Sequence, residues 1–121
     1  MIITSRSFDP HPPGIFQGEV IRIEEDKSKF DGKDQLVFTI STIPLYGEKI
    51  ERSILYWTST SLSPQSKLGG MYMAISGEEI GADLTIDTDH LLNQQALVEV
   101  EQYNRQDGQT GSRISAWKAL N

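Results

Sequence analysis

The chain has 121 residues, of which 37% are hydrophobic and 23% charged, and its formal net charge at pH 7 is −6. This length suits one domain around one hydrophobic core, and the composition excludes an intrinsically disordered chain. Cysteine is absent, which excludes disulfides and thiolate metal sites, and no apolar run approaches the roughly 18–20 residues that cross a bilayer.

Residues 1–13 include Pro10, Pro12 and Pro13 and show no hydrophobic periodicity. We therefore expect an extended or disordered arm over residues 1–13, followed by a folded domain over residues 14–121. The arm lacks the long apolar core of a signal peptide, so we expect a cytoplasmic protein with no membrane partner.

Two strand-like segments come first in the domain, Ile15–Glu24 and Gln35–Ile43. In the first segment the alternation of apolar and polar residues slips at Val20–Ile21, just after Gly18, which predicts a β-bulge or a sharp bend. The second segment has an inward side of Leu36, Phe38 and Ile40 and an outward side of Gln35, Val37, Thr39 and Ser41. We expect the outward side to be a neutral polar surface.

A third strand-like segment, Lys49–Thr58, is partly apolar on both faces. Ile50, Ile54 and Tyr56 share one face, and Leu55 and Trp57 share the other. Only one face of a regular strand can point into the core. Because the first set is longer, we expect it to be buried and Trp57 to be exposed.

A helix is predicted after the third strand, starting at Ser63-Pro64, since serine caps helices and proline suits the first helical position. Apolar residues at helical spacing form one face: Leu68, Met71, Tyr72 and Ile75. Gly77 is placed to end the helix in a C-cap.

The sequence after Gly77 predicts a connection over residues 80–93, with a short helical turn starting at Asp87 or Thr88. Two further strands are predicted over Ala96–Tyr103 and Ser112–Leu120. The predicted fold is all-β: a five-stranded Greek-key barrel of the oligonucleotide/oligosaccharide-binding (OB) type, with one α-helix between strands 3 and 4. An SH3-like barrel is the alternative, but it does not normally place a helix of this length there.

Several motifs occur in one ordered series: GIFQGEVIRIEE at residues 14–25, QLVFTI at 35–40, WTS at 57–59, SPQSKL at 63–68, IDTDHLL at 86–92 and VEV at 98–100. Over about residues 14–118 this series resembles a family of phage-derived or phage-like OB-fold proteins that are regarded as single-stranded DNA-binding proteins. The resemblance implies an OB fold and DNA binding in phage or prophage replication or recombination. Where that pattern has a glycine and a basic residue, this chain has Asn93-Gln94.

The acidity of the chain is regional. No lysine or arginine lies between Lys67 and Arg105, a stretch that holds seven carboxylates. Outside this stretch the chain has ten carboxylates and 11 cations. The rest of the chain is therefore close to neutral and can hold a phosphate backbone.

OB barrels bind ligands on the face of strands 2 and 3 and on the loops after strands 1 and 4. The candidate binding residues at these places are Lys27, Lys29, Phe30, Lys33, Arg52, Trp57 and Arg105. Cations hold phosphates and aromatic rings stack on bases. The alternative for the first loop is a solvated segment whose lysines offset nearby carboxylates, with Phe30 as an anchor.

Catalysis is not expected. His11 and His90 have no metal-ligand spacing, and neither a Gly-x-Ser-x-Gly motif nor a phosphate-binding glycine loop is present. We expect no cofactor and no metal, and single-stranded DNA as the partner, with RNA undecided. The alternative function is a protein-interaction or assembly module, favoured by the global acidity and by the absence of an acidic C-terminal tail. Oligosaccharide binding is a third option, and an exposed first strand or arm could form a homo-oligomer.

Overall fold

The computed structural model describes residues 10–27 and 32–120. Within these ranges the chain forms five strands, one α-helix and one 3₁₀ turn: β1 (Gly14–Lys27), β2 (Asp34–Pro44), β3 (Arg52–Ser59), α1 (Lys67–Ser76), η1 (Thr88–Leu91), β4 (Gln95–Asn104) and β5 (Thr110–Lys118). The predicted order of elements is confirmed, including the helix between the third and fourth strands and the helical turn that Asp87 caps.

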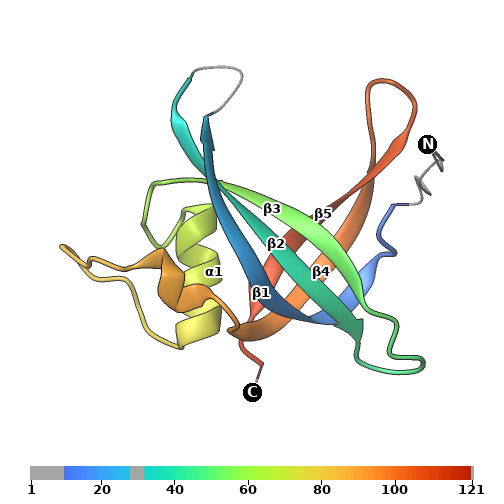
Figure 1. The fold of residues 1–121 in the computed structure, drawn as a ribbon, viewed down its shortest axis with the longest axis horizontal. Coiled ribbons are helices and arrows are strands. Elements are labelled where there is room, and N and C mark those ends of the chain that lie inside the picture. The colour runs from blue at the N-terminus through green and yellow to red at the C-terminus, as the bar shows by residue number, and fades with distance from the viewer. Residues whose placement is uncertain (1–9, 28–31, 121) are drawn as a thin grey trace, which may run out of the picture.

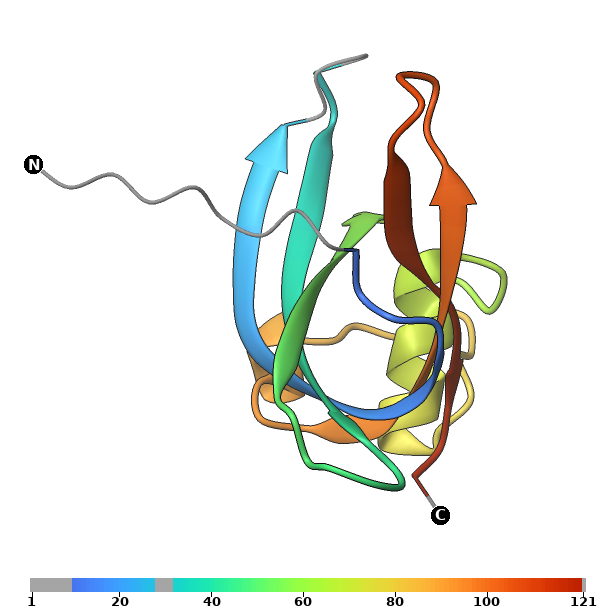
Figure 2. The ribbon, with the colours of Figure 1, turned by 90° about the vertical axis from the view of Figure 1, so that its right-hand side faces the viewer.

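The strands form one antiparallel sheet in the order β3-β2-β1-β4-β5 (Figure 1). The sheet is strongly curled, so that its two edge strands come round toward each other (Figure 2). Between β3 and β5 the described residues form no ladder, and the sheet is open along this seam. Side chains bridge the seam instead, since the rings of Tyr56 and Trp117 meet edge to face with 5.2 Å between their centroids.

The central strand β1 bends where it changes partners. Its first half pairs with β4 through Glu19, whereas its pairing with β2 continues to Lys27. The predicted bulge is confirmed, because the register with β2 shifts between Val20 and Arg22. A Cβ at Gly18 would lie 3.0 Å from Ile40 Cγ2 and 3.1 Å from Val98 Cγ1 on β4, so a glycine here lets the neighbouring side chains approach the bend closely.

The core lies inside the curl of the sheet. The expected inward side of β2 is confirmed, and on β3 the side chains of Ile54 and Tyr56 point inward as expected. Ile50 does not join them: it is 46% exposed and precedes the strand, which begins only at Arg52. Lys49 lies in the preceding turn instead, where its Nζ donates to the carbonyls of Pro44 and Leu45.

The helix α1 packs against β3, β4 and β5. The predicted apolar face is confirmed, and Gly77 adopts the left-handed C-cap conformation. The predicted start at Ser63 is wrong, because the N-cap is Ser66, whose Oγ accepts from the Gly69 amide at 2.9 Å. Ser63 forms the preceding turn instead, and its carbonyl lies 1.7 Å from where a Cβ on Gly69 would be. The turn therefore occupies the space that a side chain would need.

Candidate functional site

Adjacent residues on β3 point to opposite sides of the sheet. Tyr56 is 6% exposed in the core, while Trp57 is 43% and Leu55 49% exposed on the outside. The expectation that Trp57 rather than Tyr56 is exposed is confirmed. We call the exposed pair, Leu55 and Trp57, the outer β3 strip. Two neighbouring apolar side chains of this kind offer a flat surface on which a planar group can stack.

Strand pairing places the outer β3 strip beside β2. Trp57 lies opposite Val37, and Leu55 lies opposite Thr39. The expected open polar surface on β2 is wrong, because Val37 and Ser41 are each only 8% exposed. β2 is an inner strand of the sheet, so side chains on β1 and β3 flank and cover it. Accessible area on this face therefore comes mainly from β3 and β1.

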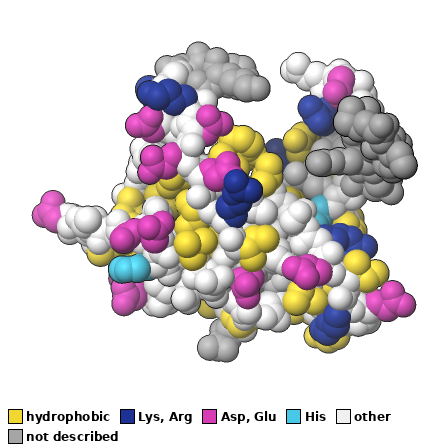
Figure 3. Space-filling view, viewed as in Figure 1, with side chains coloured by type: hydrophobic (Ala, Val, Ile, Leu, Met, Phe, Trp, Pro, Cys, Tyr) yellow, Lys and Arg dark blue, Asp and Glu magenta, His cyan; other side chains and the backbone are white. Residues whose placement is uncertain are grey.

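Carboxylates border the outer β3 strip. Glu24, opposite Val37 on β1, forms an ion pair with Arg22, and Glu51 accepts a hydrogen bond from Ser41 Oγ at 2.7 Å. Glu19 also lies on this outer side of β1 and accepts from Gln95 Nε2 at 2.9 Å. On the side of the molecule in Figure 3, hydrophobic groups lie among Asp and Glu side chains. The face is thus apolar with a mainly acidic border, in which Arg22 is paired with Glu24.

Two of the predicted cations lie on the β1–β2 hairpin. Lys27 and Lys33 are both exposed, and Lys27 Nζ is 3.6 Å from Asp34 Oδ1. An exposed pair of this type contributes only about 0–1 kcal/mol, so Lys27 can exchange Asp34 for a phosphate oxygen at little cost. The other two predicted residues of this loop, Lys29 and Phe30, lie outside the described residues.

Arg52 lies on the opposite side of β3 from Trp57, because the two residues are an odd number of positions apart on one strand. Its side chain lies beside residues 10–13, at an open end of the curled sheet. We call this end the mouth, and it is lined by residues 10–13, Arg52, Ser53 and Gln102. The other arginines that the structure describes each have a carboxylate partner: Arg22 with Glu24, Arg105 with Asp107 and Arg113 with Glu101. In the described part of the chain, Arg52 alone among arginines has none.

Arg105 lies at the tip of the β4–β5 hairpin, 4.0 Å from Asp107. The β4–β5 and β1–β2 hairpins project from the same end of the sheet and are separate from each other (Figures 1 and 2). Below the tip, the Arg113 guanidinium lies 5.1 Å from the centroid of the Tyr103 ring. The predicted residues that the structure describes therefore occupy three places rather than one: the β1–β2 hairpin with the outer β3 strip, the mouth, and the tip of the β4–β5 hairpin.

Lys67 at the start of α1 is a contact within the fold. Its Nζ lies 4.7 Å from the centroid of the Tyr56 ring, and the Tyr56 hydroxyl donates to the Lys67 carbonyl at 3.3 Å. Burial lowers the pKa of the Lys67 ammonium, and the nearby Arg113 charge lowers it further. Lys67 thus supports the core side of β3.

No model of a known protein family matches this chain. A search of curated proteins finds no matching relative either. None of the helices in the described residues has the length and apolar character needed to cross a bilayer. The expectations of no catalysis, no cofactor and a homo-oligomer stay predictions.

Proposed function

We propose that this chain is an OB-fold protein that binds single-stranded DNA without catalysis and with little sequence preference. The observation that carries the proposal is the 43% exposed Trp57 indole, beside Leu55 on the outer side of β3. Stacking of a base on an aromatic ring contributes about 1–3 kcal/mol and tolerates every base, since each has a π-face.

The architecture supports the OB part of the proposal. OB folds are partly open five-stranded Greek-key barrels whose ligands bind at the second and third strands. Here the edge strands β3 and β5 face each other across a seam, the bulged β1 pairs with both halves of the sheet, and α1 packs against strands from both edges. The exposed position of Trp57 on β3 supports a ligand site on this strand.

The β1–β2 hairpin supports the nucleic-acid part. It extends from the end of β2 that pairs with the Trp57 end of β3, because Gln35 lies opposite Ser59. Lys27 and Lys33 would hold phosphates while a base stacks on Trp57. The resemblance to phage-derived single-stranded DNA-binding proteins favours DNA over RNA and a role in phage or prophage replication or recombination.

Titration with labelled oligo-dT, followed by anisotropy and by tryptophan fluorescence, tests the proposal. The wild type should bind at low salt with quenching, and Trp57→Ala should weaken binding about 5- to 150-fold. Trp57→Phe retains a stacking ring and should bind similarly, but with the quenching lost, because Trp117 is partly buried. Tyr46→Ala, a change at an 89% exposed aromatic in the β2–β3 turn, serves as the control. Absence of binding, or equal affinity of Trp57→Ala and the wild type, contradicts the proposal.

A protein-interaction module is the second candidate, favoured by the acidic border of the outer β3 strip. The charge-neutralised variant Glu24→Gln/Glu51→Gln distinguishes DNA binding from protein interaction. If DNA lies on the strip, removing these carboxylates strengthens oligo-dT binding, since like charges no longer repel the phosphates. Glu79→Gln, at an exposed glutamate in the connection after α1, is the matched control. Failure of every one of these proteins to bind DNA favours the protein-interaction function.

A further inference from the structure

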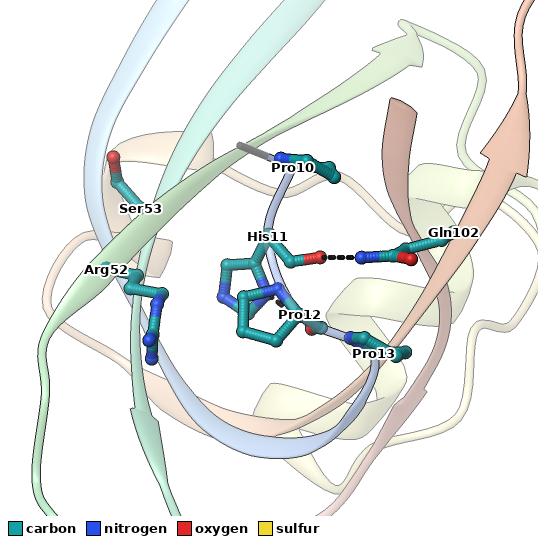
Figure 4. Close-up of a pocket in the computed structure, with 7 residues that line it drawn as sticks. All are labelled: Pro10, His11, Pro12, Pro13, Arg52, Ser53 and Gln102. Atoms are coloured by element: carbon teal, nitrogen blue, oxygen red, sulfur yellow. Dashed lines mark hydrogen bonds between the residues drawn. The ribbon is translucent and has the colours of Figure 1, made fainter. Parts of the chain in front are cut away.

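Residues 10–13 cross the mouth of the curled sheet, between the start of β3 and the β4–β5 pair (Figures 2 and 4). We call this segment the His11 strap. His11 is only 8% exposed, so the strap is part of the fold. It lines one side of an open pocket of about 740 Å³ whose other side includes Arg52 and Gln102.

The backbone of His11 holds the β4–β5 side of the mouth. Its carbonyl oxygen accepts hydrogen bonds from Ser112 Oγ on β5 at 2.8 Å and from Gln102 Nε2 on β4 at 3.3 Å. Ser112 and Gln102 lie directly opposite each other in the β4–β5 ladder. One carbonyl therefore joins the strap to both strands.

The side chain of His11 holds the other half of the sheet. Its Nε2 is 2.6 Å from Thr42 Oγ1 on β2, and its ring packs edge-on against Phe16 on β1 with 4.6 Å between centroids. Thr42 in turn lies opposite Arg52 on β3. His11 thus links strands from both sides of the open seam.

The hydrogen bonds define which ring nitrogen carries the proton. Nδ1 lies 2.8 Å from the Pro12 carbonyl oxygen, which can only accept, so Nδ1 is the N–H donor. Nε2 must then accept from the Thr42 hydroxyl. A second proton on His11 would occupy Nε2 and make it a donor to Thr42 Oγ1, so the Thr42 hydroxyl proton would lose its acceptor, and the described residues offer it no other. Thr42 is 0% exposed, so water cannot easily replace that acceptor.

The charges around His11 also oppose a second proton. The groups that pack against it are Phe16 on β1, Thr42 on β2, Arg52 on β3, Gln102 on β4 and Ser112 on β5. Arg52 is the only charged side chain among these described neighbours, and its guanidinium lies beside the His11 ring (Figure 4). Burial lowers the pKa of His11 below 6.5, the hydrogen bond to Pro12 opposes this, and Arg52 adds to the lowering.

We propose that the His11 strap is a pH-sensitive closure of the mouth, held shut by neutral His11 and released when His11 is protonated. Release breaks the bridge between Thr42 and the Gln102–Ser112 pair and exposes Arg52 further. The proposal is independent of nucleic-acid binding. Because the pKa of His11 is lowered in the closed state, the stability that neutral His11 gives to the closed state is fully present above about pH 6.5 and is lost as the pH falls toward the lowered value. Within that window, the ratio of closed to open molecules falls up to about tenfold per pH unit.

Nuclear magnetic resonance of the full chain tests the closure. The imidazole signals of the two histidines are assigned with His90→Gln and followed through the acid range. His11 should titrate below 6.5, and hydrogen-exchange protection factors at Gln102 and Ser112 should fall in step while those at the core residue Phe38 do not. A His11 pKa at or above 6.5, or protection that is unchanged on protonation, overturns the proposal.

Two variants separate closure from a general loss of stability. His11→Gln can still accept from Thr42 but does not titrate, so protection at Gln102 and Ser112 should become independent of pH. Arg52→Gln removes the neighbouring cation, so the pKa of His11 should rise toward 6.5 and the pH window should narrow. If His11→Gln does not fold, titration of Arg52→Gln still tests the closure. A His11 pKa that is unchanged in this variant contradicts the placement of Arg52 beside His11.

Discussion

The ring of Tyr56 on β3 meets the indole of Trp117 on β5 edge to face, with 5.2 Å between the ring centroids. The two residues stand on the opposite edges of the open sheet, where the described strands form no ladder. Aromatic packing thus takes the place of backbone hydrogen bonds along this part of the seam. Tyr56 also contacts the start of α1, because the Lys67 ammonium lies over its ring and its hydroxyl donates to the Lys67 carbonyl.

Removing the Tyr56 ring should destabilise the whole fold. Tyr56→Ala leaves a cavity at a residue that is 6% exposed, and the expected loss is about 3–5 kcal/mol in the free energy of unfolding. Tyr46→Ala, at an 89% exposed tyrosine, should change stability by no more than about 0.5 kcal/mol. Urea denaturation of both variants measures the difference. Equal stability of the two variants would contradict the role of Tyr56 in the seam.

The adjacent glycines of α1 should respond in opposite directions to alanine. Gly70 has open space where a Cβ would stand, so Gly70→Ala should stabilise the protein by up to about 1 kcal/mol through helix propensity. At Gly69 the new Cβ would lie 1.7 Å from the Ser63 carbonyl oxygen. Gly69→Ala should therefore destabilise the protein despite the better propensity. Melting temperatures compare the pair directly, and a gain in both variants would exclude the Ser63 turn described above.

Thr42 should matter through its hydroxyl rather than its shape. Thr42→Val keeps the volume but leaves His11 Nε2 buried without its donor, at a cost of about 1–3 kcal/mol. Thr42→Ser keeps the donor and should retain most of that stability. The comparison is made by urea denaturation near neutral pH, where His11 is neutral. A loss in Thr42→Ser that exceeds the loss in Thr42→Val would mean that the Thr42 methyl group, and not the hydrogen bond, carries the effect.

Lysines of the β1–β2 hairpin should set the salt dependence of DNA binding. Each phosphate contact contributes about −0.7 to the slope of log affinity against log salt for single strands, so Lys27→Ala/Lys33→Ala should reduce the slope by about 1.4. Lys118→Ala, at the end of β5, should leave it unchanged. Titrations of each protein with oligo-dT at several salt concentrations measure the slopes. An unchanged slope in the double variant places the phosphates elsewhere.

Local patterns in the sequence predicted most of the fold. Alternation placed the five strands, the slip after Gly18 located the bulge, and the two apolar sets on β3 predicted that Trp57 is exposed. Each of these features depends on periodicity within a few residues. The start of α1 was mistaken because Ser63 and Ser66 are both good caps, and only the packing of the turn on Gly69 distinguishes them.

Contacts between distant segments could not be read in the same way. Nothing near Val37 in sequence reveals that flanking strands cover it. The spacing of Arg52 and Trp57 in the sequence does predict that they point to opposite sides, because they are an odd number of positions apart on one strand. His11 was assigned to an arm because its partners, Thr42 and Ser112, are 31 and 101 residues away.

The His11 strap also affects where the chain can be shortened. A truncated protein that begins at Gly14 would retain every strand, yet it would lose the carbonyl that Gln102 and Ser112 share and the ring that covers Phe16. A protein that begins at Pro10 keeps every residue that makes those contacts. Trimming to the first strand would therefore yield a less stable protein than trimming to Pro10, although the two differ by only a few residues.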